Sequence, residues 1–481
     1  MAFDALGIVV AAFGGVAWGI LGGALPGISP SITMALLLPF TYSMGATTAV
    51  VMLASTYIGA EYGGSIPAIL IRTPGTNAAA ATVVDGYMMK LQGRGGEALG
   101  ISLYSGFVGG LFGMLVLVSL TERLSAVALA FTPPAYFALG VLGLSVIATL
   151  AGESLITGLM AGVLGLMIST VGTDPVTGLN RFTFDSPELL SGIPPLLVLV
   201  GIYAVADLFA KTGEPDWGKA AREEARIKFP TPAMWRRIAK PQAIGSLLGA
   251  FEGMMPGGGG AVSSFLAYNE ARRWSKHKEE FGQGSPEGIA APEAANNTVA
   301  CTALVPMLSL GIPSSNSSAV LLGGFLMHGL IPGPLLFVSH GDVVHGLYIG
   351  MFIANVAMLI IGYLIMAPCM WLVNRPRPYL MAFIYALVMS GVYAIQNSMF
   401  HVGLTLGFGV LGAGMKYFKL PVLPLVLGVV LGFMVESNFR RALVISGGDY
   451  RTFVQDPIAA TLLVVALLFV AGSLFRRLRD T

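Results

Sequence analysis

The chain has 481 residues, of which 55% are hydrophobic and only 11% are Asp, Glu, Lys or Arg, with a formal net charge of +2. A soluble domain usually carries about 25% charged residues. This composition therefore predicts a polytopic membrane protein and argues against a soluble enzyme or a nucleic-acid-binding protein. The two cysteines, Cys301 and Cys369, lie in apolar runs, which argues against a disulfide framework or a metal cluster.

The N-terminal apolar run, 5–25, has no basic leader, and the first Lys or Arg of the sequence is Arg72. We therefore expect no cleavable signal peptide and an N-terminus on the periplasmic side. Two segments, 5–44 and 242–272, are each split by a Pro-Gly cluster into pieces shorter than, or close to, the roughly 20 residues of a straight span. We interpret both segments as re-entrant hairpins.

Besides these hairpins, the sequence predicts an all-α membrane protein with about 11 transmembrane crossings. Two of the crossing segments, 47–90 and 291–330, are interrupted in the middle. The other apolar runs that we expect to cross are 97–121, 134–150, 153–170, 188–209, 343–372, 378–396, 400–417, 420–438 and 457–475.

Basic residues indicate which loops face the cytoplasm, where Lys and Arg are in excess. The longest polar interruption, 211–240, holds eight basic and four acidic residues. Further basic groups are Arg272, Arg273, Lys276, Lys278 and, near the C-terminus, Arg476, Arg477 and Arg479. We therefore expect a cytoplasmic C-terminus. Arg440, Arg441 and Arg451 would fall on the periplasmic side, and this topology does not explain them.

Short patterns recur in the same order in the two halves of the chain. Gly19-x3-Gly23-x2-Pro26-Gly27 recurs at an offset of 230, Pro67-x6-Pro74-x2-Asn77 at 239, and Gly158-Leu159-x2-Gly162 at 245. With the topology above, the first repeat starts outside and the second starts inside. We therefore predict two inverted repeats with interrupted helices, as in many secondary transporters. The predicted parts are a first repeat 1–210, a basic cytoplasmic linker 211–241, a second repeat 242–440 and an extra C-terminal transmembrane helix in 441–481.

The two interrupted segments contain the first pair of candidate sites. Each has a proline followed by residues that cap helix N-termini, and a helix starting there presents free N–H groups to an anion. We interpret the pair as a carboxylate site, with hydroxyl and amide oxygens available for Na⁺; alternatively, these residues only cap and pack the helices. The substrate-binding candidates are Thr73, Gly75, Thr76, Asn77, Ser314, Ser315, Asn316 and Ser317.

The two Pro-Gly turns of the hairpins form a second pair of candidates, because glycines there let the backbone form an anion-binding concavity. The alternative is a tight hairpin tip without a ligand. The candidate residues are Pro26, Gly27, Ser29, Ser31, Gly257, Gly258 and Gly259.

Polar residues flank both interruptions, and a carboxylate inside a membrane segment is a functional candidate by default. Glu61, Glu293, Asn296 and Arg72 are candidates of lower priority, since each could instead pair structurally or lie at an interface. Asp85 and Gly86 are interpreted as a structural helix exit. The candidates for a coupling cation are Asn77, Thr76, Asn316, Ser315 and Asn297.

Catalytic signatures are missing from the sequence. The five histidines have no metal-ligand spacing, and no Walker motif, ordered Ser-His-Asp set or cofactor fingerprint is present. We therefore predict a protein that is not an enzyme, has no cofactor, and binds no transition metal.

At the Pro-Gly turns and the interrupted segments, the chain resembles the large membrane subunit of the tripartite tricarboxylate transporters. The resemblance extends from about residue 15 to 440. The resemblance is carried by Gly22-Gly23-Ala24-Leu25-Pro26-Gly27, Tyr62-Gly63-Gly64-Ser65-Ile66-Pro67-Ala68-Ile69-Leu70, Thr73-Pro74-Gly75-Thr76, Asp85-Gly86-Tyr87, Ala291-Pro292-Glu293-Ala294-Ala295-Asn296-Asn297 and Leu310-Gly311-Ile312-Pro313. The family pattern often has Gly after the last of these prolines, where this sequence has Ser314.

The resemblance implies a bacterial inner-membrane importer of carboxylates, driven by Na⁺ or H⁺. It also implies two partners: a small membrane subunit of about four helices and a periplasmic solute-binding protein. Two alternatives remain open at this point. One is a stand-alone carboxylate carrier or channel without a delivery protein, and the other is an intramembrane enzyme, for which we find no aligned catalytic residues.

Overall fold

The computed structural model describes residues 5–25, 28–128, 130–150, 155–174, 178–211, 227–255, 259–366, 368–369 and 377–480. The chain forms two compact units, and each unit combines a segment from each half of the sequence. Unit 1 comprises Met1–Leu124 and Gly213–Leu387, and unit 2 comprises Ser125–Thr212 and Val388–Thr481. These units are defined by packing, so the repeat boundaries predicted from the sequence remain a prediction.

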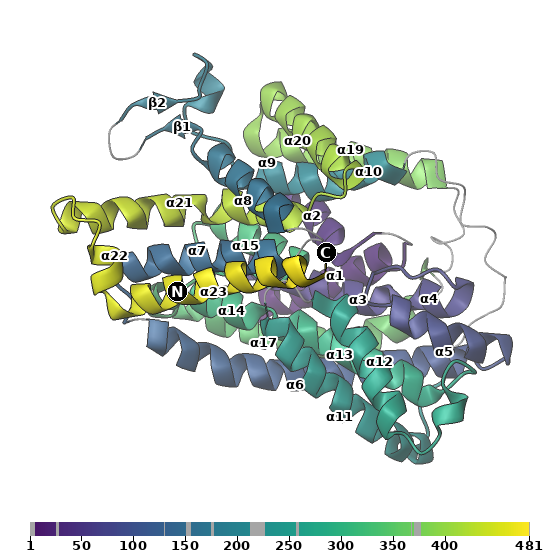
Figure 1. The fold of residues 1–481 in the computed structure, drawn as a ribbon. Coiled ribbons are helices and arrows are strands. Elements are labelled where there is room, and N and C mark those ends of the chain that lie inside the picture. Colours follow the sequence, from purple (N-terminus) through teal and green to yellow (C-terminus); the bar gives the residue numbers. More distant parts are fainter. Residues whose placement is uncertain are drawn as a thin grey trace. The chain divides into compact units, whose positions relative to one another are not determined.

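The described part of unit 1 consists of helices joined by loops and contains no strand (Figure 1). Its N-terminal helices are α1 (Ala5–Gly23), α2 (Pro30–Thr41), α3 (Ala46–Gly63), α4 (Ser65–Ile71), α5 (Ala80–Leu91) and α6 (Gly95–Ala128), the last of which continues into unit 2. After the unit boundary follow α11 (Pro232–Met254), α12 (Gly259–Trp274), η3 (Lys278–Glu280), α13 (Pro286–Thr302), α14 (Leu304–Leu310), α15 (Asn316–Met327), α16 (Pro334–Ser339), α17 (Gly341–Leu364) and the start of α19 (Arg377–Gln396).

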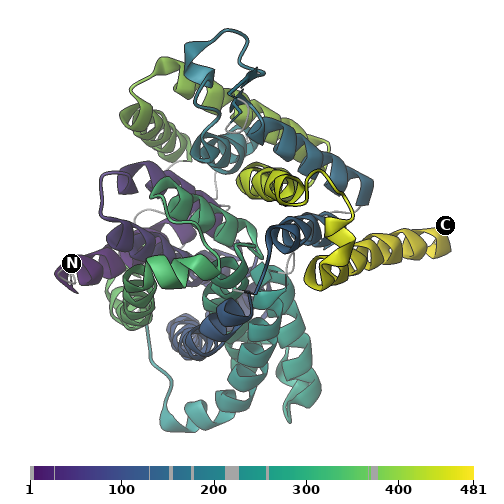
Figure 2. The ribbon, with the colours of Figure 1, turned by 90° about the vertical axis from the view of Figure 1, so that its left-hand side faces the viewer.

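Unit 2 is built mainly of helices that lie side by side, with α23 beside α7 in both ribbon views (Figures 1 and 2). A two-residue antiparallel ribbon pairs Gly172 with Arg181. Its elements are α7 (Pro133–Leu150), α8 (Leu155–Ser169), β1 (Gly172–Thr173), β2 (Asn180–Arg181), η1 (Pro187–Leu189), α9 (Pro195–Leu199), the π-helical η2 (Val200–Val205), α10 (Ala206–Lys211), α20 (Met399–Tyr417), α21 (Val422–Ile445), α22 (Thr452–Gln455) and α23 (Pro457–Asp480).

The predicted helical character is confirmed for the described residues, and most predicted spans coincide with helices. Within that part of the chain, four helices are long and apolar enough to cross a membrane: Ala5–Gly23, Gly95–Ala126, Gly341–Leu364 and Val422–Ile445. Helix Ala5–Gly23 is by itself long enough to cross the membrane, although the sequence predicts that it is one arm of a re-entrant hairpin. The hairpins and the number of crossings therefore remain predictions.

Both interrupted segments break in the same way. The residues ending α4 and α14, Arg72 and Gly311, have φ angles of 59° and 74°. In each case the next amide donates back to a proline carbonyl at 3.3 Å, from Thr73 to Pro67 and from Ile312 to Pro306. The helix cannot continue past these left-handed residues, so the chain leaves as an extended loop before α5 or α15 begins. The predicted interruptions are confirmed as helix breaks.

The helix pairs α1–α3 and α11–α13 pack through equivalent glycines. A Cβ added at Gly19 would come within 3.0 Å of the Thr56 carbonyl oxygen, and one added at Gly249 would come as close to that of Ala295. The glycines differ by 230 positions and their partners by 239, which are two of the three offsets found in the sequence. The contact of Gly15 with Met52 recurs in the same way between Gly245 and Ala291. Glycine lets the helix backbones approach this closely.

The unexplained basic residue Arg440 is neutralised by neighbouring acids in unit 2. Its guanidinium lies 2.8 Å from Asp174 and 2.8 Å from Glu436, and Glu436 also pairs with Arg181 on β2 at 2.6 Å. These pairs join the end of α21 to the two-stranded ribbon.

Candidate functional site

The first break forms a loop, residues 72–79, that packs on the end of α1. The Gly75 amide donates to the Gly64 carbonyl oxygen at 2.9 Å. A Cβ at Gly75 would overlap the carbonyl oxygen of Gly23 and come within 3.0 Å of the Gly64 Cα. Glycine is therefore required at position 75 by close backbone packing, and a direct role in ligand binding is not needed to explain it.

The second break, residues 311–315, ends in a reciprocal cap on α15. The Ser315 hydroxyl accepts from the Ser318 amide at 3.2 Å, and the Ser318 hydroxyl accepts from the Ser315 amide at 2.9 Å. The capping alternative thus applies to Ser315. In the first break, the Thr76 hydroxyl accepts from the Ala79 amide at 3.3 Å, and Ala79 itself gives α5 no side-chain cap, so the N–H groups of the first turn of α5 have no capping side chain.

Helix α3 brings the two breaks together. The Tyr57 hydroxyl interacts with the side chains of Ser315 and Ser317 in the second break. Four residues later, the Glu61 carboxyl interacts with Thr76 of the first break and with Asn296 of α13. Residues four apart lie on one face of a helix. The two breaks therefore reach the same buried face of α3, and they do so entirely within unit 1.

Several buried oxygens of α3, α13 and the second break have no hydrogen-bond partner among the described residues. They are Glu61 Oε2, Asn296 Oδ1, Asn297 Oδ1 and Ser314 Oγ. A buried polar atom without a partner costs about 1–3 kcal/mol, and such atoms in native proteins usually meet a water, an ion or a ligand. Carboxylate, amide and hydroxyl oxygens are also the ligands that hard cations prefer. This donor set therefore fits Na⁺.

The start of α12 reaches this group as well. A Cβ added at Gly260 would lie 2.6 Å from Asn296 Oδ1 and 3.2 Å from the Ala78 side chain of the first break. Among the predicted hairpin residues, Pro26, Gly27, Gly257 and Gly258 lie outside the described residues. Gly259 is the first residue of α12.

The serines after the first Pro-Gly turn have a capping geometry. Ser29 is the N-cap of α2, where its hydroxyl accepts from the Ile32 amide at 3.4 Å and lies 2.8 Å from that of Ser31. Ser31 is buried. Ser29 therefore has a capping role, which agrees with the alternative that this turn needs no ligand.

Glu293 on α13 is a fully buried carboxylate that accepts hydrogen bonds from three helices. Ser65 of α4 donates at 2.5 Å, Ser102 of α6 donates at 3.0 Å, and Thr82 of α5 donates to the same oxygen as Ser65. The carboxylate thus connects the half-helices on both sides of the first break to the second half of the chain. Thr82 and Ser102 were not singled out from the sequence, where the only signal was a hydroxyl in an apolar run.

Other polar candidates lie at the surface of the described structure. Asn77 and Asn316 are exposed, as is Arg72, whose guanidinium carbon lies 5.8 Å from the ring centroid of Tyr87. Thr76 and Ser317, by contrast, are buried. The two asparagines therefore stand at the rim of the group that Tyr57 and Glu61 organise.

Asp85 does not lie at a helix exit, as predicted, because α5 continues to Leu91. Its Oδ1 accepts from the amides of Gly282, Gly284 and Ser285 at 2.8–2.9 Å, and its Oδ2 accepts from the Tyr268 hydroxyl at 2.9 Å. Asp85 therefore holds α5 to the loop that precedes α13. Its predicted structural role fits this geometry, whereas its predicted position at the helix end is wrong.

The sequence was compared with protein families, with individual proteins and with solved structures. It matches the family described as the tripartite tricarboxylate transporter TctA family over residues 9–427. It is 39% identical over 474 residues to an uncharacterized 52.8 kDa protein in the TAR-I ttuC' 3' region of Agrobacterium vitis, covering 98% of this chain and 94% of that protein. An uncharacterized protein in the TAR-II ttuC' 3' region of the same organism is 36% identical over 234 residues, 48% of this chain and 96% of the relative. No solved structure matches.

Proposed function

The chain belongs to the tripartite tricarboxylate transporter TctA family, and we propose that it imports a carboxylate solute across the bacterial inner membrane, driven by a gradient of Na⁺ or H⁺. It acts as the large membrane subunit of a three-component system. A small membrane subunit of about four helices and a periplasmic solute-binding protein complete that system. The N-terminus is periplasmic and the C-terminus cytoplasmic.

One observation carries the proposal: Tyr57 and Glu61, on one face of α3, contact both helix breaks. The α5 and α15 N-termini start at these breaks, and helix N-termini favour carboxylates. Glu61 and Asn296 interact with each other and each has a partnerless oxygen; these oxygens would supply cation ligands. Bringing an anion and a cation to one site would give the coupling that a symporter needs.

The recurrence of the glycine contacts at matched offsets supports a duplicated architecture. We infer that the two copies have opposite orientation in the membrane, as in other carriers with interrupted helices at the bilayer midplane. This inference rests on the distribution of basic residues along the sequence.

The test is transport in proteoliposomes that contain the chain and its membrane partner, with the binding protein and a labelled carboxylate outside. We expect uptake that requires both an imposed cation gradient and the binding protein. Uptake without the binding protein would instead favour a stand-alone carrier, and uptake indifferent to the gradient would contradict cation coupling.

The site assignment is tested separately by Asn77→Leu and Asn316→Leu. Each removes a polar group at the rim of a break, so we expect uptake to fall at least tenfold while the amount of folded protein in the membrane stays the same. Asn269→Leu, at an exposed position on α12, is the matched control and should transport normally. Normal transport by both break variants would refute the assignment.

A further inference from the structure

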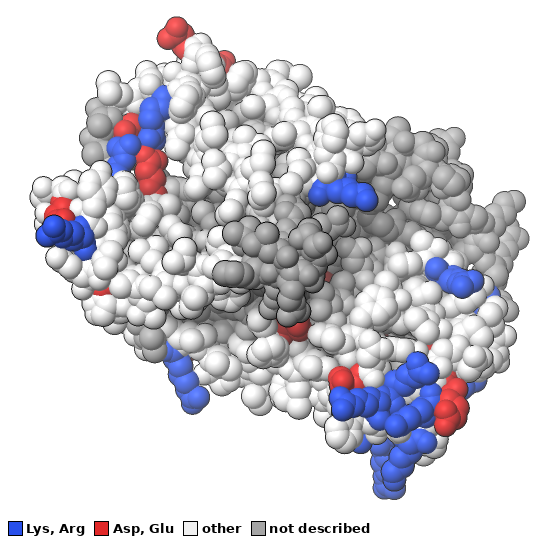
Figure 3. All heavy atoms as spheres, viewed as in Figure 1, with Lys and Arg blue, Asp and Glu red and all other residues white. Residues whose placement is uncertain are grey.

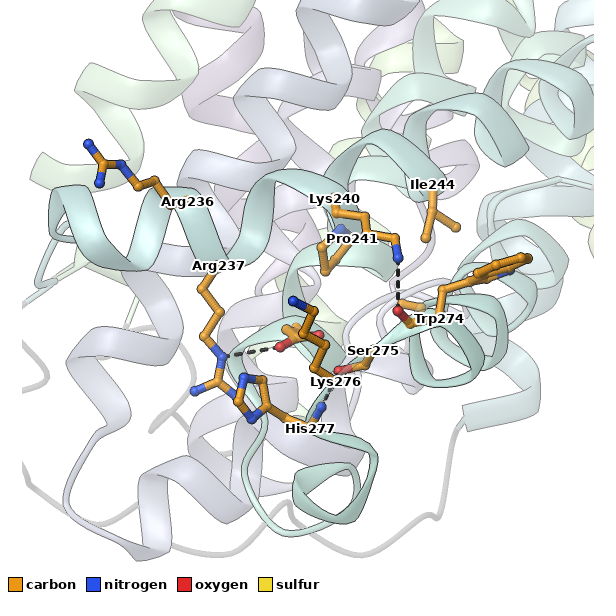
Figure 4. A pocket seen from close by; sticks show the side chains of 11 residues that line it. Arg236, Arg237, Lys240, Pro241, Ile244, Trp274, Ser275, Lys276 and His277 are labelled. Atoms are coloured by element: carbon orange, nitrogen blue, oxygen red, sulfur yellow. Dashed lines mark hydrogen bonds and ion pairs between the residues drawn. The ribbon is translucent and has the colours of Figure 1, made fainter.

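The described structure has a second polar site, a pocket of 410 Å³ at the charged end of α11 and α12. Figure 3 shows Lys and Arg side chains gathered at this end of the molecule. In the close-up, Arg237, Lys240, Lys276 and His277 surround one space, while the Arg236 side chain extends away from them (Figure 4).

The pocket keeps positive charge that its own acids do not neutralise. Arg237 pairs with Glu280, and it pairs with Glu287 at 3.2 Å, so its charge is compensated. Lys240 donates only to a neutral acceptor, the Trp274 carbonyl oxygen, at 2.9 Å. Lys276 is exposed and has no ion pair within the described part of the chain. Two ammonium groups with spare donors therefore face the pocket, which is the chemistry that binds a phosphate.

The helices continue from this pocket as exposed apolar stripes. On α11, Lys240 and Ile244 line the pocket, and Leu247 and Phe251 follow at helical spacing with 63% and 60% of their surfaces exposed. On α12, Leu266 and Val262 are 41% and 45% exposed and lie on the same face as Trp274, with Glu270 between Leu266 and Trp274.

The tryptophans mark the level of the membrane interface. Trp274 lines the pocket and is 57% exposed, and Trp235, five residues before Lys240 on α11, is 45% exposed. Exposed Trp residues beside basic residues at the end of a helix with an apolar face are typical of the headgroup level of a bilayer. A free phosphate would use the lysines alone, whereas a lipid would use the lysines and the apolar stripes together.

We propose that this pocket binds the phosphate of an anionic phospholipid. Lys240 and Lys276 contact the headgroup, and the acyl chains lie along the stripes of α11 and α12. The lipid would hold these two helices at the membrane surface, on the element that carries Gly260 to the carboxylate site.

The experiment titrates the detergent-purified full chain with phosphatidylglycerol, counting bound lipid by native mass spectrometry, with phosphatidylcholine for comparison. We expect tight binding of phosphatidylglycerol only. The variant Lys240→Gln/Lys276→Gln should lose about thirtyfold in affinity, the effect of removing two cations near a membrane surface. The control Arg272→Gln/Lys278→Gln removes the same charge from exposed positions outside the pocket and should bind like the unchanged protein.

Equal losses in the two double variants would mean a diffuse charge effect and overturn the proposal. It would also be overturned if inorganic phosphate displaced the lipid at millimolar concentration with the same dependence on Lys240 and Lys276, since the site would then serve a free anion. Size-exclusion profiles establish that both variants fold. The measurement is independent of transport, so its failure and that of the proposed function are distinguishable.

Discussion

Glu293 is the residue with the densest set of buried polar contacts at the candidate site. Three hydroxyl donors from α4, α5 and α6 converge on its carboxylate. A buried charge is retained in a membrane segment chiefly where it is solvated by such groups or serves transport. The two roles are separable, because substitution with an amide keeps the shape and removes the charge.

We predict that Glu293→Gln lowers uptake at least tenfold with little loss of folded protein, because Gln retains an acceptor oxygen for the hydroxyls but cannot carry the negative charge. Glu293→Ala should instead destabilise the fold by about 3 kcal/mol or more, since it leaves three buried hydroxyls without their acceptor. Proteoliposome uptake and thermal unfolding in detergent measure the two effects.

The control is Glu252→Gln on α11, a partly exposed carboxyl outside this group of hydroxyls, which should change neither quantity. A Glu293→Gln protein that takes up substrate at the normal rate with the normal ion dependence would show that the charge at this position has only a structural role.

At the scale of elements, the breaks could be predicted from the sequence and their partners could not. Pro74 and Pro313 interrupt the helix in which they occur, and the glycine patterns lie within single helices. The helix ends and the close packing of α1 on α3 can therefore be predicted from short sequence patterns. Glu293 and its three donors are 191 to 228 positions apart. Nothing in a single sequence identifies such pairs, because they depend on how the helices pack.

Which polar side chains of the two breaks are exposed could not be predicted from the sequence either. Asn77 and Thr76 are adjacent and equally suited to binding, yet one is exposed and the other buried. The same applies to Asn316 and Ser317. The choice between them depends on which side of each loop faces α3.

The link between α5 and α13 is predicted to depend on Asp85. Asp85→Asn replaces a carboxylate that accepts four hydrogen bonds with an amide that accepts fewer and carries no charge. Hydrogen bonds to a charged acceptor contribute about 1.5–3 kcal/mol each, so we expect a destabilisation of roughly 3 kcal/mol, measured as a lower thermal midpoint.

We also expect faster amide hydrogen exchange at Gly282, Gly284 and Ser285 of the Asp85→Asn protein, because their N–H groups then donate to a neutral amide oxygen, a weaker acceptor than the carboxylate. Glu279→Gln changes an exposed carboxylate of the same loop and serves as the control, with unchanged stability and exchange. Unaltered exchange at 282–285 after Asp85→Asn would contradict the anchoring role.

For the whole molecule, the central question is whether the two halves of the chain contribute to one site or to two. Thr76→Val and Ser317→Ala test this as a double-mutant cycle, because each changes a buried hydroxyl of a different break, and the two contact α3 through Glu61 and Tyr57. If both hydroxyls serve one bound solute, removing either disturbs the same complex, and the second substitution costs less than it does alone. With a tenfold loss of uptake efficiency in each single variant, we expect the double variant to lose clearly less than the hundredfold product. A loss equal to that product would mean that the two hydroxyls contribute independently, which would contradict the predicted coupling between the breaks.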